Sequence, residues 1–213
     1  MQNAATSGPA YRSAFPANAR SNGVGTSRTF DPPGPAYRWR TRSRTEGIRK
    51  AYRAQMDKLI AAVEGAATAK EKGNAFEVLC VALFKSIKGF DIHQRIRHSD
   101  EEIDLVIWNE SSIPPWSNAG EVLLAECKNR KKRSGTNDYD LLARKMQKRH
   151  DRCRVAFLLS WNGFTKTIAT AQQSDRRDKN VIVPISGVDI RTALENSDFA
   201  TLLKDRYRTA MLA

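Results

Sequence analysis

Residues 121–129 read EVLLAECKN, an apolar stretch that carries an acid and a base only two positions apart. Successive side chains of a β-strand point to opposite faces, so Glu126 and Lys128 share one face, about 6.6 Å apart along the strand. Cys127 points to the other face, where a small apolar residue packs well. Because the rest of the stretch is apolar on both faces, we expect a central strand covered by helices on both sides.

The sequence around this strand alternates between helical and extended patterns. A leading amphipathic helix is expected over 45–68, and a second helix, apolar on nearly every side, over 70–89. Two strands separated by a polar turn around Ser99 follow as a hairpin. The expected order then continues with the strand at 121–129, a helix at 136–151, a strand at 154–160, a helix at 164–173, a strand at 180–186 and a helix at 187–206. This order predicts an α/β domain with a central mixed β-sheet flanked by helices.

The composition of the chain restricts its partners. The 213 residues include 36 Lys and Arg but only 23 Asp and Glu, which gives a formal charge of +13. Such a charge suits nucleic acid or an anionic membrane surface. No apolar run approaches the roughly 20 residues of a membrane span, and no signal-peptide core is visible. The three cysteines lack CxxC spacing and are expected to be buried and reduced, so we expect a cytoplasmic protein that binds nucleic acid rather than a membrane.

Residues 1–44 differ in composition from the rest of the chain. They are rich in Ala, Ser, Pro, Gly and Arg, with seven arginines against one acid, Asp31. Such a segment buries too little apolar area to offset its ordering entropy, so we interpret it as a disordered tail. A second interpretation stays open, in which its arginines grip phosphates and Tyr37 and Trp39 offer stacking faces.

Two further acids stand inside apolar elements. Asp104 lies within IDLVI of the second expected strand, where a charge is costly unless it is paired or binds a metal. Glu77 is the acid of an otherwise apolar helical run, GNAFEVLCVALF. Carboxylates of Asp104 and Glu126 on neighbouring strands can share Mg²⁺, which accepts one or two carboxylates. Lys128 beside them can orient a water or stabilise charge that develops on a phosphate.

Each of these residues also has a purely structural interpretation. Glu126 and Lys128 could be the frayed end of a strand, Asp104 an acid at a hairpin edge, and Glu77 a partly exposed helix residue. The combination is harder to explain in that way, because the charges interrupt three apolar elements in the order acid, acid, acid-x-lysine. We therefore interpret the four residues as one site.

This order resembles that of the PD-(D/E)XK nucleases, which have the restriction-endonuclease-like fold, and most of all the Mrr-type restriction endonucleases. Three segments carry the resemblance, GNAFEVLCVALF, DEEIDLVIWN and LLAECKN, with weaker support from VAFLLSWNGFTKTIATAQQ. It covers roughly residues 70–203. Two departures are visible: no proline precedes Asp104, and Glu126 stands where many Mrr-like members have glutamine.

The resemblance implies an αβββαβ core and a metal-dependent endonuclease that hydrolyses phosphodiester bonds in DNA, in restriction or defence against foreign DNA. By analogy Asp104 and Glu126 bind Mg²⁺, for which Mn²⁺ can substitute, and Glu77 supports the metal shell. Lys128 serves the attacking water. The resemblance leaves open a homodimer and a separate recognition subunit or domain as further partners.

Basic residues near the expected site are candidates for contact with the DNA backbone. Four leave the end of the site strand and three lie on the following helix: Arg130, Lys131, Lys132 and Arg133, then Lys145, Lys148 and Arg149. A phosphate backbone that crosses the site would meet the first group. A solvated loop and a solvated helix face are the alternative interpretations of the two groups.

Two other functions remain open on the same fold. One is a non-catalytic nucleic-acid-binding module that has lost turnover, although such a module need not keep the acid-x-lysine pair. The other is a Holliday-junction resolvase or an RNA nuclease, which only the geometry of the substrate would separate from a DNA endonuclease.

Overall fold

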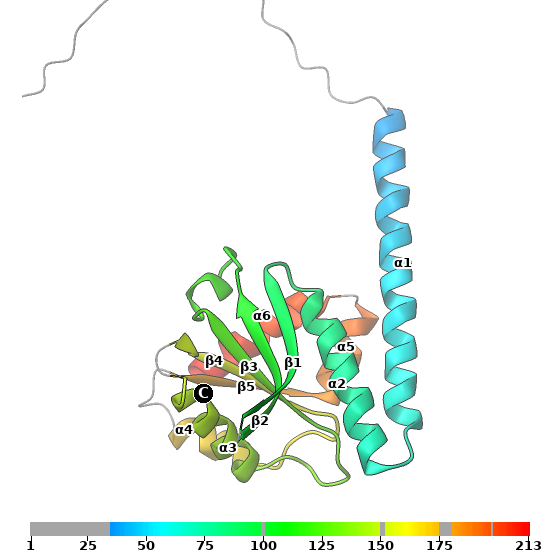
Figure 1. Ribbon diagram of the computed structural model, residues 1–213. Coiled ribbons are helices and arrows are strands. Elements are labelled where there is room, and N and C mark those ends of the chain that lie inside the picture. The colour runs from blue at the N-terminus through cyan, green and yellow to red at the C-terminus, as the bar shows by residue number, and fades with distance from the viewer. Residues whose placement is uncertain (1–34, 99–100, 150–151, 175–179, 197) are drawn as a thin grey trace, which may run out of the picture. The chain divides into compact units, whose positions relative to one another are not determined.

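The computed structural model describes residues 35–98, 101–149, 152–174, 180–196 and 198–213 (Figure 1). The elements are, in chain order, α1 (Pro35–Gly65), α2 (Ala69–Lys85), β1 (Phe90–His98), β2 (Glu101–Asn109), a 3₁₀ turn (Trp116–Asn118), β3 (Val122–Lys128), α3 (Thr136–Gln147), β4 (Val155–Ser160), α4 (Thr167–Ser174), β5 (Val181–Ser186), α5 (Gly187–Glu195) and α6 (Phe199–Leu212). The chain divides into two units, residues 1–40 and 41–213, and the second contains the sheet.

The five strands form one mixed sheet in the order β1-β2-β3-β4-β5. β2 pairs antiparallel with both β1 and β3, whereas β3, β4 and β5 run parallel to one another. The site strand β3 is therefore central, and its residues from Val122 to Cys127 are all buried. The prediction of an α/β domain with a central mixed sheet is confirmed.

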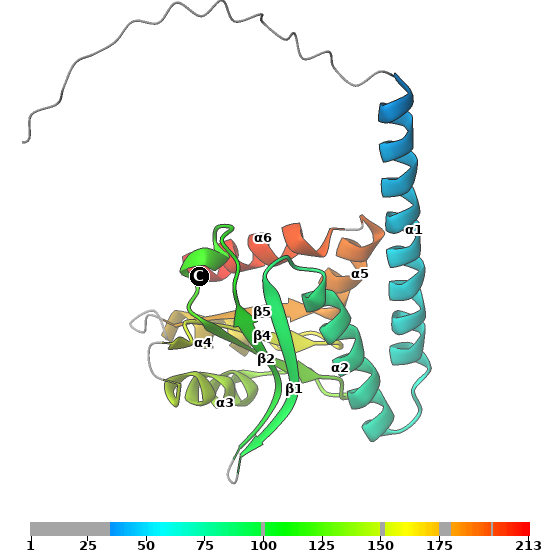
Figure 2. The same ribbon diagram turned by 45° about the horizontal axis from the view of Figure 1, so that its top comes forward.

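Helices cover both faces of this sheet, with α3 and α4 on one side and α2, α5 and α6 on the other (Figure 2). The alternation along β3 directs successive side chains to opposite faces of the sheet. Leu123, Ala125 and Cys127 pack in the core against α2, α5 and α6. Val122 and Leu124 pack in the core against α3 and α4. Because Glu126 follows the second set in register, it lies on the α3 side.

The two ends of the domain differ from the expectation. α1 begins at Pro35, ten residues before the expected start at 45, and the described part of the expected tail is therefore helical. Proline is well suited to the first position of a helix because its missing N–H is not needed there. The rest of the tail, residues 1–34, lies outside the described residues. The expected C-terminal helix is divided into α5 and α6, and the side chain of Asp198 caps the second of them.

Gly120 fixes the approach of the chain to β3. Its φ of +96° lies in a region that L side chains rarely adopt, and a Cβ there would stand 2.6 Å from the carbonyl oxygen of Arg152. Glycine therefore lets the start of β3 pass close to the segment that enters β4. Among the helices of the described residues, none combines the length and apolar character that a membrane crossing requires.

Candidate active site

The candidate site lies where β2 and β3 stop pairing. The β2–β3 ladder ends at the pair Leu105–Ala125, whereas β3 continues beside β4 as far as Lys128. Beyond that point Asp104 Oδ2 accepts a hydrogen bond of 2.7 Å from the backbone N–H of Cys127. A side-chain carboxylate thus takes the place of the next ladder acceptor, which brings the Asp104 charge into the sheet beside Glu126.

Glu126 lies at the centre of the site with only 5% of its side chain exposed. Its Oε1 accepts a hydrogen bond of 2.5 Å from Lys128 Nζ, and its Oε2 accepts one of 2.7 Å from Lys145 Nζ. Lys145 also donates to the backbone carbonyl of Glu102, at 2.6 Å. Two strands and one helix therefore contribute to a compact set of two carboxylates and two ammonium groups.

Burial and charge shift the pKa values of Asp104 and Lys128. Desolvation and the nearby charge of Glu126 raise the pKa of Asp104 to about 6, although the Cys127 N–H and the charge of Lys128 act in the opposite direction. Burial of Lys128 favours its neutral form. The charge of Glu126 and the hydrogen bond to it outweigh that effect, with Asp104 adding to them, so the pKa of Lys128 is raised. The two carboxylates thus repel each other across the gap between β2 and β3.

Cys127 lies on the other face of β3, as the alternation predicts. It packs in the core that includes Cys80 of α2, and burial raises the pKa of its thiol well above the usual value. A thiol in such surroundings is a poor nucleophile and a small packing group. The three cysteines are all buried and free, which agrees with the sequence-based expectation.

Glu77 lies beside the site but is bound to another residue. Its Oε2 accepts a hydrogen bond of 2.8 Å from Arg95 Nε, and its side chain is 15% exposed. The guanidinium of Arg95 also donates to the side chain of Asn74. The charge of Glu77 contributes to the raised pKa of Asp104, so the two carboxylates are close enough to interact electrostatically. Glu77 therefore belongs to the surroundings of the Asp104–Glu126 pair.

Arg95 was missed by sequence reasoning. It lies on β1 between the pairs Gln94–Leu105 and Ile96–Ile103, so it stands opposite Asp104 in register. Its φ is +48°, the left-handed region, which costs an L residue roughly 1 kcal/mol or more. No glycine or asparagine marks this position in the sequence, and nothing local could have indicated the unusual backbone.

Lys145 is the clearest correction among the candidate residues. It was expected as a contact to DNA phosphates, yet its side chain is 7% exposed and its ammonium faces Glu126. The sequence held a signal, because Lys145 follows Tyr139 and Leu142 at helical spacing and shares their buried side of α3. A lysine on the apolar side of a helix needs a buried acceptor, and Glu126 provides it.

The other basic candidates lie nearer to solvent. Lys131, Lys132 and Arg133 are exposed on the loop that leaves Lys128. Arg130 is exposed as well, but its guanidinium is paired with Asp138 at the start of α3. On α3 and its C-terminal turn, Lys148 is exposed, and Arg149 is partly buried with its guanidinium on the Lys145 carbonyl.

The site offers a hard divalent cation two carboxylates rather than three or more. Across the described ranges, no group of three or more His, Cys, Asp and Glu side chains is arranged to hold a metal ion. Mg²⁺ accepts one or two carboxylates and keeps water or phosphate oxygens in its other positions. Asp104 and Glu126 repel each other and are the right kind of ligand, so a cation held by these two residues would relieve that repulsion.

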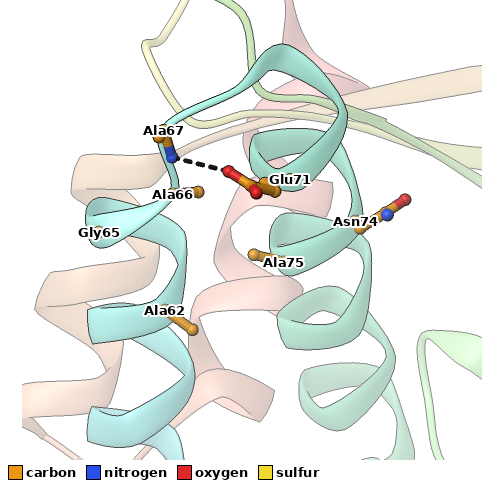
Figure 3. A pocket seen from close by; sticks show the side chains of 7 residues that line it. All are labelled: Ala62, Gly65, Ala66, Ala67, Glu71, Asn74 and Ala75. Carbon is orange, nitrogen blue, oxygen red and sulfur yellow. Dashed lines mark hydrogen bonds between the residues drawn. The ribbon is translucent and has the colours of Figure 1, made fainter.

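A separate hollow of about 620 Å³ lies between α1 and α2 (Figure 3). Most of its lining is small, from Ala62, Gly65, Ala66, Ala67 and Ala75, with Asn74 and Glu71 as the polar members. Glu71 accepts hydrogen bonds from the N–H groups of Ala67 and Thr68, so its carboxylate is already used in the cap of α2. The carboxylates of the candidate site do not line this hollow.

The chain matches no family model and no curated protein. A solved structure described as a protein of unknown function, AF1548, aligns with a TM-score of 0.36 and 16% identity. The alignment covers 51% of this chain and 55% of that chain, so it spans about half the length of each. A likeness of this degree assigns no function.

Proposed function

We propose that this protein is a metal-dependent endonuclease that hydrolyses phosphodiester bonds in DNA, with a site of the PD-(D/E)XK type. The observation that carries the proposal is the meeting of Asp104, Glu126 and Lys128 where β2 and β3 part. The pattern that suggested this function is short, but Asp104 comes from β2 and Glu126 and Lys128 from β3, and the three side chains meet at one place in the fold. The resemblance to Mrr-type enzymes extends the proposal to restriction or defence against foreign DNA.

Each residue has a role that its position supports. Asp104 and Glu126 would hold Mg²⁺, which supplies Lewis-acid stabilisation of phosphate oxygens when it is bound. Lys128, at the open end of β3 with 21% of its side chain exposed, can orient a water and stabilise the negative charge that develops on the phosphate. The charge of Glu77, held by Arg95, adds to the negative potential at Asp104.

The proposal that the substrate is a nucleic acid rests on the positive charge of the chain and on where the exposed cations lie. The chain carries a formal charge of +13, and the exposed cations Lys131, Lys132 and Arg133 follow directly after the site strand. A backbone bound by this loop would pass beside Lys128, because the loop begins at that residue. Phosphate contacts of this kind position the substrate without reading its sequence.

A second candidate has one observation in its favour. Both oxygens of Glu126 are bound by ammonium groups, so the charges of the site are largely balanced without a cation. A non-catalytic nucleic-acid-binding module on the same fold would be stable in that form. It would bind DNA equally with and without divalent cations and would not cut it.

A cleavage assay separates the two candidates. We expect supercoiled plasmid to be cut in the presence of Mg²⁺ or Mn²⁺ and to stay intact in EDTA. Single-stranded DNA, RNA and branched DNA substrates test the alternatives of an RNA nuclease and a junction resolvase. Asp104→Ala and Lys128→Ala should abolish cutting and leave DNA binding largely intact. Unchanged cutting by either variant would overturn the assignment of the site.

A further inference from the structure

The two lysines that bind Glu126 differ in how firmly they are held. Lys145 comes from the last turn of α3, exposes 7% of its side chain, and makes two hydrogen bonds, to Glu126 Oε2 and to the Glu102 carbonyl. Lys128 ends β3 and exposes 21% of its side chain, and its ammonium makes one hydrogen bond to a side chain of the described residues, to Glu126 Oε1. The ammonium group of Lys145 is therefore buried and held by two hydrogen bonds, whereas that of Lys128 lies nearer to solvent.

This difference decides which bond to Glu126 can open. A buried ammonium that loses its acceptors pays a large desolvation cost, since it cannot reach water in their place. Lys145 is also fixed through α3, because the side chains of Tyr139, Leu142 and Met146 on the same helix are packed in the core. Lys128 can turn toward water at the open end of the strand, so its bond to Glu126 is the cheaper one to break.

We propose that Lys145 is a positioning residue that keeps Glu126 Oε2 in place, while Oε1 exchanges the Lys128 ammonium for a divalent cation. The exchange releases Lys128 toward the substrate phosphate. The cation would then act in two ways, by offsetting the repulsion between the carboxylates and by freeing the lysine. This inference rests on the metal site of the proposed function and deepens it, because it gives the two lysines different roles.

The two variants Lys128→Met and Lys145→Met remove the same charge from the same carboxylate, which makes the comparison between them informative. If both lysines were simple counterions, each variant would bind a cation more tightly, because one competing positive charge is gone. If Lys145 positions Glu126, its loss weakens cation binding in spite of that charge effect. Lys85→Met, at the far end of α2, is the matched control for the loss of one exposed lysine.

Calorimetric titration of the full, metal-free chain with Mn²⁺ alone measures these affinities. We expect Lys128→Met to bind Mn²⁺ about fivefold more tightly than the wild type, since it removes a competitor worth about 1 kcal/mol. Lys145→Met should bind it roughly 10- to 100-fold more weakly, as is usual when a residue that orients a metal ligand is removed. Lys85→Met should match the wild type. Circular dichroism of each variant checks the fold.

Ammonium nitrogen NMR of the wild type gives a second measurement that does not depend on the folding of Lys145→Met. In the metal-free protein both ammonium groups should be protected from solvent exchange by their bonds to Glu126, and Lys128→Met identifies one of the two signals. Addition of Mg²⁺ should remove the protection of Lys128 and leave that of Lys145. Loss of protection at Lys145, or its retention at Lys128, would overturn the inference.

The outcomes also separate this inference from the proposed function. A wild-type protein that binds no Mn²⁺ overturns the proposed metal site and, with it, the exchange at Glu126. A wild type that binds Mn²⁺, together with a Lys145→Met variant that binds it as tightly or more tightly, overturns only the positioning role. The nuclease proposal would then stand on Asp104, Glu126 and Lys128.

Discussion

The backbone N–H of Cys127 donates a hydrogen bond to the carboxylate of Asp104, 2.7 Å away, at the point where β2 leaves β3. The bond satisfies a strand N–H that would otherwise lack a ladder partner. It also holds an acid in partly buried surroundings next to Glu126, and desolvation with the Glu126 charge raises the pKa of Asp104 to about 6. The geometry that ends the strand pair therefore also creates a carboxylate that is costly to ionise.

We expect the cost of ionising Asp104 to make the stability of the metal-free protein depend on pH. The pKa of Asp104 is about 6 in the folded state against an ordinary 3.8, so the folded protein binds the proton more tightly than the unfolded chain. The contribution of Asp104 to stability is then highest below pH 4 and falls as the pH rises to 6, by about 2 to 3 kcal/mol. Asp104→Asn keeps an acceptor for Cys127 and cannot ionise. We expect the free energy of unfolding of the wild type, relative to this variant, to fall between pH 4 and pH 7 in urea denaturation.

Asp198 provides a control of opposite sign. It caps α6, and the hydrogen bonds from Thr201 lower its pKa below the ordinary value. The advantage of the wild type over Asp198→Asn should therefore be lost as the pH falls through the range below 4, where Asp198 takes up its proton. An Asp104→Asn difference that stays constant with pH, or moves in the Asp198 direction, would contradict the account of Asp104.

Much of the site was accessible from the sequence because strand alternation is a strong local signal. It placed Glu126 and Lys128 on one face and Cys127 on the other, and it placed Asp104 on the neighbouring strand. The interaction between Lys145 and Glu126 was not accessible in that way, because it joins α3 to β3 through packing that only the assembled layers define. The left-handed backbone of Arg95 had no local signal either, since its neighbours are ordinary strand residues.

The pair Glu126–Lys145 should show strong energetic coupling. Glu126→Gln leaves the buried ammonium of Lys145 without its carboxylate, and Lys145→Met leaves Glu126 with Lys128 alone. Each single change is expected to destabilise the protein by about 3 to 5 kcal/mol. The double variant removes both charges, so its cost should be smaller than the sum of the single costs by roughly 1 to 3 kcal/mol. Urea denaturation of the four proteins measures this coupling.

The matched comparison is the same cycle with Lys128→Met in place of Lys145→Met. Lys128 is three times as exposed as Lys145, so its charge is better solvated once Glu126 is neutral. We expect a coupling energy of about 1 kcal/mol or less for Glu126 and Lys128. Equal couplings in the two cycles would mean that the two lysines are held alike, contrary to their burial.

The backbone strain at Arg95 can be measured by comparing the stabilities of two variants with small residues at this position. Arg95→Ala and Arg95→Gly both remove the ion pair with Glu77, but only glycine adopts a φ of +48° without strain. We expect Arg95→Gly to be about 1 kcal/mol more stable than Arg95→Ala in thermal or urea unfolding. At the neighbouring exposed position Gln94 the order should be reversed, because glycine weakens an ordinary strand. The same order at both positions would remove the evidence for strain at Arg95.

The loop after β3 should dominate the salt dependence of DNA binding. Lys131, Lys132 and Arg133 are exposed beside Lys128, whereas Arg130 is held by Asp138, so the first three are the cations available to phosphates. Each phosphate contact contributes about 0.9 to the slope of log affinity against log salt. Replacing all three by alanine should lower the slope by about 2 to 3, measured on a short DNA duplex in EDTA.

The control for this triple variant removes an equal charge elsewhere, through alanine at three exposed lysines: Lys58 of α1, Lys85 at the end of α2, and Lys88 in the turn before β1. Its salt slope should stay close to that of the wild type if the loop is the contact surface. An equal loss of slope in both triple variants would mean that DNA responds to the net charge of the chain alone.

The loop variant should also keep the rate of cutting at saturating DNA, because Lys128 and both carboxylates are intact. Loss of that rate would place the loop in the chemical step as well as in binding.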